Sequence, residues 1–318
     1  QRYVGDKLYD LLAATEVPRL ENVKDLSTVE SIDLNSLQKI KTNIPEIDRV
    51  IGGLVMSQVV LLTGKRGEGK STFMSQLVCE ALDQGENVFV YSGELADYHF
   101  KRWLDYQLAG TGNIQSHLNP YGDYEYSIAK SVLDQISNWY KGRAYIYDNS
   151  WVPDGGEEME TLPETIEKVI RQYSVRLVCI DNLMTAMETV ADNSQLNLAQ
   201  SNFVGKLKQI AAKYDVVIIL VAHPRKSKDD FSNDDVAGSA DITNKADVVM
   251  SYQRSDSTDC NSILQVTKNR LFGKYAVKDD AVRLMYSEKS KRIFSSDGDR
   301  HYGWEKNFTK TDEDAWMI

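Results

Sequence analysis

Apolar runs of strand length alternate with helical patterns through the middle of the chain. The apolar runs lie at 59–62, 87–91, 144–147, 175–180 and 216–221. Helical patterns, with apolar residues three or four positions apart, lie at 71–82, 95–108, 126–140, 162–173 and 196–214. The stretch 110–123 is rich in Gly, Asn and Pro and is interpreted as a loop. Strands that are apolar on both faces and separated by helices predict a mostly parallel sheet with helices on both sides.

The pattern changes after Asn244. Strand-like segments then follow one another without long helices between them, at 246–252, 262–268, 281–286 and 292–294. Such a series predicts an antiparallel extension at one edge of the sheet. The chain is therefore predicted to be an α/β protein. Because the carboxyl ends of parallel strands meet at one edge of a sheet, we expect the functional residues to cluster there.

The two ends of the chain depart from this globular pattern. Residues 1–38 contain one short amphipathic stretch at 8–12, so we predict a linker arm with a short helix, followed by one domain over 39–318. A frayed terminus is the alternative for the arm. The acidic segment 312–314 is expected to belong to a disordered tail. The chain begins with Gln rather than Met, which is consistent with a fragment of a longer polypeptide.

Composition and charge narrow the class of protein. Hydrophobic residues make up 42% of the 318 residues and charged residues 26%, which is typical of a globular protein with a substantial core. The net charge of −10 argues against a basic coat for nucleic acid, although it leaves a local positive channel open. The longest apolar run, 216–222, is far shorter than the roughly 20 residues that span a bilayer, so no membrane partner is expected.

The cysteines favour a reduced compartment. Cys79, Cys179 and Cys260 are an odd number without the spacing of metal ligands, and the first two fall in apolar patterns that predict buried thiols. No signal peptide is visible. We therefore expect an intracellular protein in a reduced compartment.

A phosphate-binding motif lies at the first junction between an apolar run and a helix. Residues 64–71, Gly-Lys-Arg-Gly-Glu-Gly-Lys-Ser, fit G-x-x-x-x-G-K-[ST]. The glycines allow backbone N–H groups and the start of the helix to point at a polyphosphate. Lys70 is expected to reach the β- and γ-phosphates, and the Ser71 hydroxyl to bind Mg²⁺. The predicted nucleotide ligands in this segment are Gly64, Arg66, Gly67, Glu68, Gly69, Lys70, Ser71 and Thr72. The expected cofactors are ATP, or another NTP or dNTP, and Mg²⁺.

Polar residues end three other strands. Asp181 follows the 175–180 run and is predicted to bind the water shell of Mg²⁺. Glu94 follows the 87–91 run and is predicted to orient or deprotonate the attacking water, the alternative being a carboxylate that favours the start of the next helix. His223 is predicted to contact the γ-phosphate, with a purely structural histidine as the alternative.

The loop after His223 carries candidate ligands for nucleic acid. Arg225, Lys226 and Lys228 have the chemistry to bind a phosphate backbone. However, residues 225–235 contain three basic and four acidic groups, so a solvated loop is a fair alternative.

Lys268 and Arg270, with one residue between them, follow a predicted edge strand. Two cations there have the reach to neutralise charge on the γ-phosphate of a neighbouring subunit, as an arginine finger does. Two exposed surface cations are the alternative.

In sequence order these motifs resemble the RecA-like motor domain of the DnaB family of replicative ring helicases, especially its Twinkle and phage primase-helicase branch. The resemblance covers about residues 40–294. It rests on the phosphate-loop motif together with Ser-Gly-Glu-Leu at 92–95, Cys-Ile-Asp-Asn-Leu at 179–183, His-Pro-Arg-Lys at 223–226, Gly-Ser at 238–239 and Lys-Asn-Arg at 268–270. The resemblance implies a RecA-like P-loop NTPase fold and a DNA helicase that moves 5′ to 3′ on single-stranded DNA as a homo-oligomeric ring, expected to be a hexamer.

The resemblance also implies residue roles and partners. Arg254 and Tyr286 would flank the adenine base, and Lys268 and Arg270 would act on the ATP of the adjacent subunit. The 225–235 loop would face DNA in the central channel, and the helix near 8–12 would match the linker helix that docks on a neighbour. A primase, a loader and a polymerase are further candidate partners, although no primase domain is present in this sequence. The resemblance further implies a location in the cytoplasm of a bacterial or phage-infected cell.

Two alternatives from other classes stay open. The first is a KaiC-like or RadA-like regulatory or recombination ATPase that does not unwind DNA, which the acidic channel loop favours. The second is a nucleotide or small-molecule kinase, against which stand the strands after Asn244 and the lack of an arginine-rich lid.

Overall fold

The computed structural model describes residue 7 and residues 23–152, 160–187, 196–223, 240–295 and 300–307. The chain divides into two units, Gln1–Leu37 and Gln38–Ile318. In the first unit the described elements include two single 3₁₀ turns, η1 (Leu26–Thr28) and η2 (Leu34–Ser36). Each follows an aspartate whose side chain accepts a hydrogen bond from a backbone N–H two residues further on. The helix predicted at 8–12 lies outside the described residues.

The second unit is built around a sheet. In the described part of the chain it has nine strands in the order β13-β12-β11-β10-β3-β9-β8-β4-β7. They are β3 (Val59–Thr63), β4 (Asn87–Ser92), β7 (Ala144–Ile146), β8 (Val175–Asp181), β9 (Val217–Ala222), β10 (Val248–Arg254), β11 (Ser262–Asn269), β12 (Val282–Tyr286) and β13 (Ile293–Phe294). Neighbours from β7 to β10 are parallel, and those from β10 to β13 are antiparallel. This confirms the predicted α/β fold with a mostly parallel sheet and an antiparallel extension.

One strand belongs to a different part of the sheet than the pattern predicts. The segment 246–252 is expected in the antiparallel extension, but β10 pairs with β3 in parallel, with Ser251 level with Thr63. The helix α8 (Ala240–Lys245) precedes β10 and returns the chain to the end of the sheet at which β3 begins. Because the phosphate loop follows β3, β10 becomes the direct neighbour of that loop.

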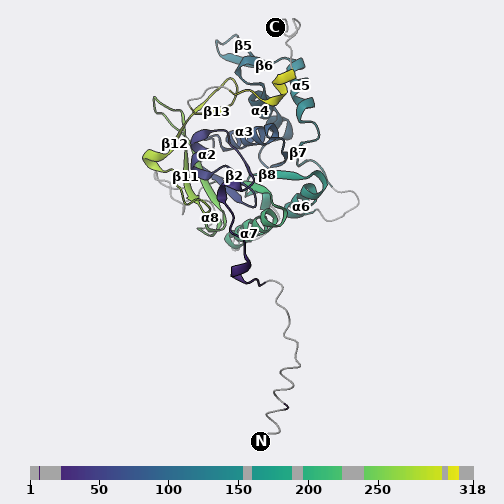
Figure 1. Cartoon of the computed structure of the whole chain (residues 1–318). Helices are drawn as coiled ribbons and strands as arrows, with labels where there is room; N and C mark the ends of the chain where they lie inside the picture. The colour runs from purple at the N-terminus through teal and green to yellow at the C-terminus, as the bar shows by residue number, and fades with distance from the viewer. Residues whose placement is uncertain are drawn as a thin grey trace. The chain divides into compact units, whose positions relative to one another are not determined.

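Helices cover both faces of the sheet (Figure 1). They are α2 (Pro45–Ile51), α3 (Lys70–Asp83), α4 (Asp97–Ala109), α5 (Lys130–Tyr140), α6 (Leu162–Tyr173), α7 (Leu196–Tyr214) and α8. Helices α2 to α5 pack into one core and α6 to α8 into a second. Successive strand residues point to opposite faces, so β3 supplies Val60 and Leu62 to the first core and Val59 and Leu61 to the second. None of the described helices is both long enough and apolar enough to cross a membrane.

The remaining elements of the second unit are short. They are the paired strands β1 (Lys39–Ile40) and β2 (Leu54–Val55) and the 3₁₀ turns η3 (Thr111–Asn113), η5 (Thr185–Met187), η8 (Lys278–Asp280) and η9 (Gly303–Asn307). The burial predicted for Cys79 and Cys179 is confirmed, and Cys260 is buried as well.

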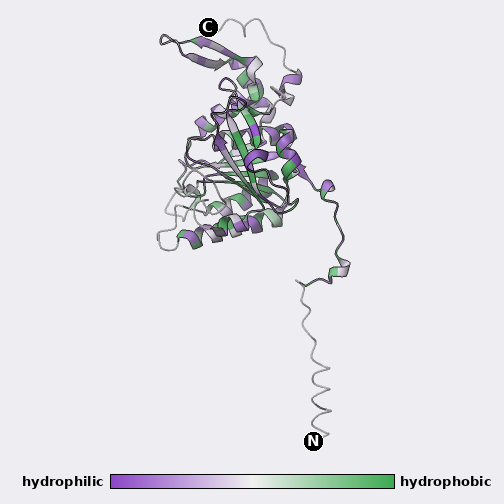
Figure 2. Cartoon of the chain, turned by 90° about the vertical axis from the view of Figure 1, so that its left-hand side faces the viewer, coloured by the Kyte–Doolittle hydropathy of each residue, from purple (hydrophilic) through white to green (hydrophobic). Residues whose placement is uncertain are grey.

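A β-hairpin replaces a predicted loop and the start of a predicted helix. Strand β5 (Ile114–Leu118) lies in the stretch interpreted as a loop, and it pairs with β6 (Tyr124–Ile128), so that α5 begins only at Lys130. The turn between the strands is closed by Asn119, whose side-chain oxygen accepts from the N–H groups of Tyr121 and Asp123. Figure 2 shows the hairpin projecting from the body of this unit.

Candidate active site

The phosphate loop joins β3 to α3 and needs its glycines for two reasons. Gly64, Gly67 and Gly69 have φ angles of 145°, 78° and 106°, a region that favours glycine. A Cβ on Gly64 would also lie 2.1 Å from the carbonyl oxygen of Tyr252 in β10. Position 64 therefore accepts only glycine, because the neighbouring strand leaves no room for a side chain there.

Lys70 begins α3 and its ammonium group lies over the loop. Its Nζ donates to the carbonyl oxygens of Gly64 and Lys65, each at 2.7 Å. Burial lowers the pKa of Lys70, while the carboxylates of Asp181 and Glu94 act in the opposite direction. The strand-end carboxylates are thus close enough to Lys70 to interact with it electrostatically.

Asp181 ends β8 and is 1% exposed. Neither of its carboxylate oxygens has a hydrogen-bond partner of normal geometry among the described residues. Burial raises the pKa of Asp181, and the nearby Ser71 hydroxyl opposes that shift. A buried carboxylate with unfilled lone pairs beside a serine hydroxyl fits a hard cation that prefers oxygen ligands, as Mg²⁺ does.

Glu94 and His223, each just beyond the end of a strand, meet in the same cleft. The Oε1 atom of Glu94 lies 3.2 Å from Nε2 of His223. Asn182, which directly follows Asp181, donates from its Nδ2 atom to the same Oε1 at 2.5 Å. The structure therefore joins two predicted residues through a third, Asn182, to which the sequence reasoning gives no role. Its only sequence signal is its place after the strand-end aspartate.

A hydrogen bond and close packing join the ends of β4 and β8, which carry Glu94 and Asp181. The N–H of Gly93 donates to the carbonyl oxygen of Asp181 at 2.6 Å. A Cβ on Gly93 would lie 2.1 Å from Oγ1 of Thr185, so the turn after Asn182 packs directly onto the backbone that precedes Glu94. Close packing at Gly93 is the reason why Glu94 and Asn182 approach within hydrogen-bond distance.

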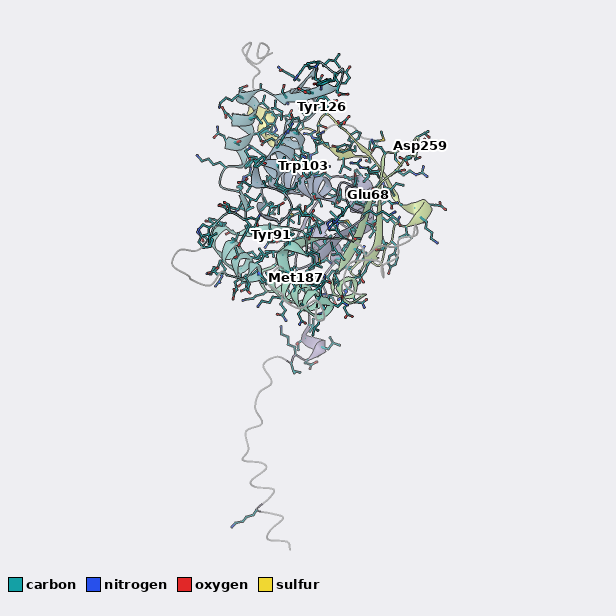
Figure 3. The ribbon with its side chains drawn as sticks, turned by 180° about the vertical axis from the view of Figure 1, so that it is seen from behind. Glu68, Tyr91, Trp103, Tyr126, Met187 and Asp259 are labelled. Atoms are coloured by element: carbon teal, nitrogen blue, oxygen red, sulfur yellow. The ribbon has the colours of Figure 1, made fainter. Side chains whose placement is uncertain are left out.

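Two adjoining cavities flank the phosphate loop. One of about 560 Å³ holds three of the predicted catalytic residues, Lys70, Glu94 and His223. Its full lining is Arg66, Gly67, Gly69, Lys70, Ser71, Thr72, Glu94, Leu95, Trp103, His223 and Arg254. The other, of about 450 Å³, is lined by Glu68, Gly69, Thr72, Tyr252, Arg254, Ser255, Asp256, Asn261, Ser262, Tyr286, Glu288 and Ile293. Figure 3 labels Glu68 and Trp103, one from the lining of each. Because Gly69, Thr72 and Arg254 line both, a triphosphate in the first cavity can continue to a base in the second.

Backbone contacts hold the second cavity in shape. Asn261 binds both backbone groups of Tyr286, accepting from its N–H at 2.6 Å and donating to its carbonyl oxygen at 3.1 Å. The side chain of Glu68 accepts from the N–H of Arg254 and so joins the phosphate loop to β10. The Tyr252 ring stacks on Phe73, and burial raises the pKa of Tyr252 to about 12. Arg254 and Tyr286 thus line the cavity that adjoins the phosphate site, where a base would lie.

Lys268 and Arg270 lie at the opposite end of the sheet from the phosphate loop. In the ladder, Asn269 pairs with Val248, and Val248 pairs with Val60 at the start of β3. The Nζ atom of Lys268 donates to the carbonyl oxygens of Thr243 and Asn244, near the end of α8, at 2.7 and 2.8 Å. Arg270 donates to the same Asn244 oxygen at 2.6 Å. Neither cation lines either of the two cavities beside the loop of its own subunit.

Some predicted residues lie outside the described part of the chain. They are Arg225, Lys226 and Lys228, the Gly-Ser pair at 238–239 and the acidic segment 312–314.

A family model described as "AAA domain" matches residues 27–229, more than half of the chain. The chain belongs to this family. Similar curated proteins include the DNA repair protein RadA of Mycobacterium tuberculosis, 25% identical over 244 residues, which are 76% of this chain and 41% of RadA. The circadian clock oscillator protein KaiC 1 of Synechocystis is 26% identical over 180 residues, 55% of this chain and 30% of KaiC 1. The chain thus spans less than half the length of these relatives.

Solved structures share the fold. A DnaB-like replicative helicase, studied with its interactions with primase, superposes with a TM-score of 0.63 at 18% identity, covering 81% of this chain and 62% of that one. A second solved structure, of an ATPase domain, gives 0.62 at 16% identity, covering 92% of this chain and 97% of that domain. Together with the family match, these likenesses confirm a RecA-like P-loop ATPase fold of the kind found in DnaB-family motor domains.

Proposed function

We propose that this RecA-like P-loop ATPase is the motor of a DNA helicase that assembles as a ring and moves along single-stranded DNA. The observation that carries the proposal is the position of Lys268 and Arg270. Lys268 lies near the end of β11 and Arg270 directly follows that strand, so both are at the end of the sheet opposite the phosphate loop of the same subunit. Cations so placed can complete an ATP site only on a neighbour, and head-to-tail contacts of this kind form a ring when the rotation between subunits closes.

The cleft residues have distinct roles in hydrolysis. Ser71 and Asp181 are the groups that would hold Mg²⁺, which when bound supplies positive charge between the β- and γ-phosphates. Lys70 exchanges its two loop carbonyls for phosphate oxygens. Glu94 accepts a proton from the attacking water, and His223 contacts the γ-phosphate. Arg254 and Tyr286 flank the base, and Lys268 and Arg270 approach the γ-phosphate from the next subunit.

The loop over 225–235 extends the proposal to DNA. Arg225, Lys226 and Lys228 would bind the phosphate backbone in the channel, and movement of this loop between ATP states would advance the strand in the 5′-to-3′ direction. The DnaB-like neighbour interacts with primase, so a primase is a candidate partner of this chain too.

The main experiment measures ATP hydrolysis with and without single-stranded DNA, beside the assembly state in solution and the opening of a forked duplex. We expect DNA-stimulated hydrolysis, a ring-sized oligomer and unwinding. If DNA does not stimulate hydrolysis, or if the assembled protein does not unwind the forked duplex, the helicase proposal fails.

A mixing experiment tests the trans role of Arg270. Subunits with Arg270→Ala keep an intact phosphate loop, and subunits with Lys70→Ala keep an intact Arg270. Each variant alone should lose about 10³-fold or more in kcat, since a finger contributes on that scale. Mixed rings contain some complete interfaces and should recover part of the activity, whereas an absence of recovery would contradict action in trans.

A second function is favoured by the sequence comparisons. RadA and KaiC 1 are similar curated proteins, so a recombination or regulatory ATPase that uses ATP for assembly is the rival. DNA-stimulated hydrolysis without any unwinding of a fork would select this rival over the helicase.

A further inference from the structure

Asn182 is buried, at 1% exposure, between the metal-binding strand end and the catalytic cleft. Its side-chain oxygen Oδ1 accepts hydrogen bonds from the backbone N–H groups of Met184 and Thr185, at 2.8 and 3.2 Å. A backbone N–H can only donate, so Oδ1 must face the η5 turn. The amide orientation is therefore set by the fold, and the donor atom Nδ2 must face the cleft.

The donor atom meets two of the proposed catalytic residues. Nδ2 lies 2.5 Å from Oε1 of Glu94 and 3.2 Å from Nε2 of His223. The bond to Glu94 involves an ionised acceptor and is short, and such bonds are about twice as strong as neutral ones. Nε2 of His223 accepts from Asn182 when it carries no proton and donates to Glu94 when it carries one, so it cannot make both hydrogen bonds at once. Its other ring nitrogen, Nδ1, has no partner among the described residues.

We propose that Asn182 is a positioning residue for hydrolysis: it holds the Glu94 carboxylate at the angle needed for the attacking water while leaving His223 free to turn. The hydrogen bond from Asn182 to Glu94 is stronger than its contact with His223, so the contact with His223 breaks first. A γ-phosphate draws the weakly held imidazole toward itself, and Glu94 keeps its bond to Asn182. The proposal rests on the proposed function in one respect, which is that Glu94 acts as the base for ATP hydrolysis.

The alternative is that Asn182 only caps the η5 turn. The isosteric variant Asn182→Asp separates the two roles, because it keeps the Oδ1 acceptor for Met184 and Thr185 and replaces the donor toward Glu94 with an oxygen. A matched control is Asn87→Asp, whose Nδ2 donates to the carbonyl oxygen of Tyr173 at the far end of the sheet. The control loses one amide donor without touching the cleft.

Steady-state ATP hydrolysis by the full chain, with and without single-stranded DNA, tests the proposal. We expect Asn182→Asp to lower kcat about 100-fold, within the range that a misaligned general base costs, with KM for ATP changed less than about 2-fold. Asn87→Asp should keep the wild-type kcat. Wild-type kcat in Asn182→Asp, or a loss that appears only in KM, would overturn the proposal.

The double variant Asn182→Asp with Glu94→Gln distinguishes positioning of Glu94 from simple capping of the η5 turn. If Asn182 acts through Glu94, then Asn182→Asp should cost nothing further once Glu94→Gln has removed the base, since residues that act as a unit are not additive. If Asn182→Asp lowers kcat by the same factor with Glu94 present and with Glu94→Gln, Asn182 has only a structural role. Should Asn182→Asp fail to fold, Asn182→Ser replaces it, and if neither folds the positioning role is rejected.

The outcome also stays distinct from that of the helicase proposal. A loss of kcat in Asn182→Asp without any DNA stimulation of the wild type would reject the helicase and keep the inference. If DNA stimulates hydrolysis by the wild type and Asn182→Asp keeps the wild-type kcat, the helicase proposal stands and the inference about Asn182 is rejected.

Discussion

Gly93→Ala tests how tightly the strand ends that carry Glu94 and Asp181 are joined. The added Cβ would lie 2.1 Å from Oγ1 and 2.3 Å from Cβ of Thr185, whereas real Cβ contacts essentially never fall below 3.0 Å. The difference, 3.0 minus 2.1, requires a shift of at least 0.9 Å. Thr185 is β-branched and sits in the turn that Asn182 caps, so the shift is expected to spread to Asn182 and Glu94.

The expected cost has two parts. Overpacking of this kind typically costs about 1–3 kcal/mol in free energy of unfolding, and a displacement of about 1 Å near reacting groups can lower kcat about 100-fold. We therefore expect Gly93→Ala to lower both the Tm and the kcat for ATP. Thermal unfolding and steady-state hydrolysis measure the two effects separately.

The control is Gly112→Ala, since a Cβ there meets no atom within 4 Å and the residue is not at a positive φ. It should leave Tm and kcat unchanged. The double variant Gly93→Ala with Thr185→Gly removes the clashing side chain and should recover part of the lost stability. The reasoning is refuted if Gly93→Ala alone has the wild-type Tm and kcat.

Two further predictions concern Asp181, the proposed metal ligand, and Tyr286, which is proposed to flank the base. Burial raises the pKa of Asp181, so its charged form destabilises the fold above its unfolded pKa near 3.8, and this cost grows as the pH rises through the folded pKa. Asp181→Asn should therefore abolish hydrolysis yet raise the Tm at neutral pH and not at pH 3. The control, Asp134→Asn at an exposed position, should change neither the activity nor the Tm. A lowered Tm in Asp181→Asn at neutral pH would contradict the assignment. Tyr286→Ala should raise KM for ATP about 10-fold with kcat unchanged, because stacking contributes about 1–1.5 kcal/mol. Tyr124→Ala, on the exposed hairpin, is its control, and an equal change in both variants would exclude a base contact.

Much of the fold could be predicted because the signals are local. The phosphate loop needs glycines at fixed spacing, and parallel strands buried on both faces are apolar at every position, as in 216–221. The helices 162–173 and 196–214 are found at the predicted bounds. The first has a strong apolar periodicity and a capping box formed by Thr161 and Glu164. The hairpin escaped prediction for two reasons: Ile114–Leu118 lies in a stretch rich in Gly, Asn and Pro, and the end of Tyr124–Ile128 overlaps a helical pattern that begins at 126.

By itself, the sequence determined that a polyphosphate-binding loop lies at the end of a parallel strand, with Glu94, Asp181 and His223 at the ends of others. Only the tertiary structure decided that β10 borders the loop, that Lys268 lies at the far end of the sheet, and that Asn182 joins Glu94 to His223. These contacts connect residues far apart in the chain, such as Asn182 and Glu94 at a separation of 88 positions. Local propensity carries no information about such pairs, because strand order and the packing at Gly93 bring them together only once the sheet has formed.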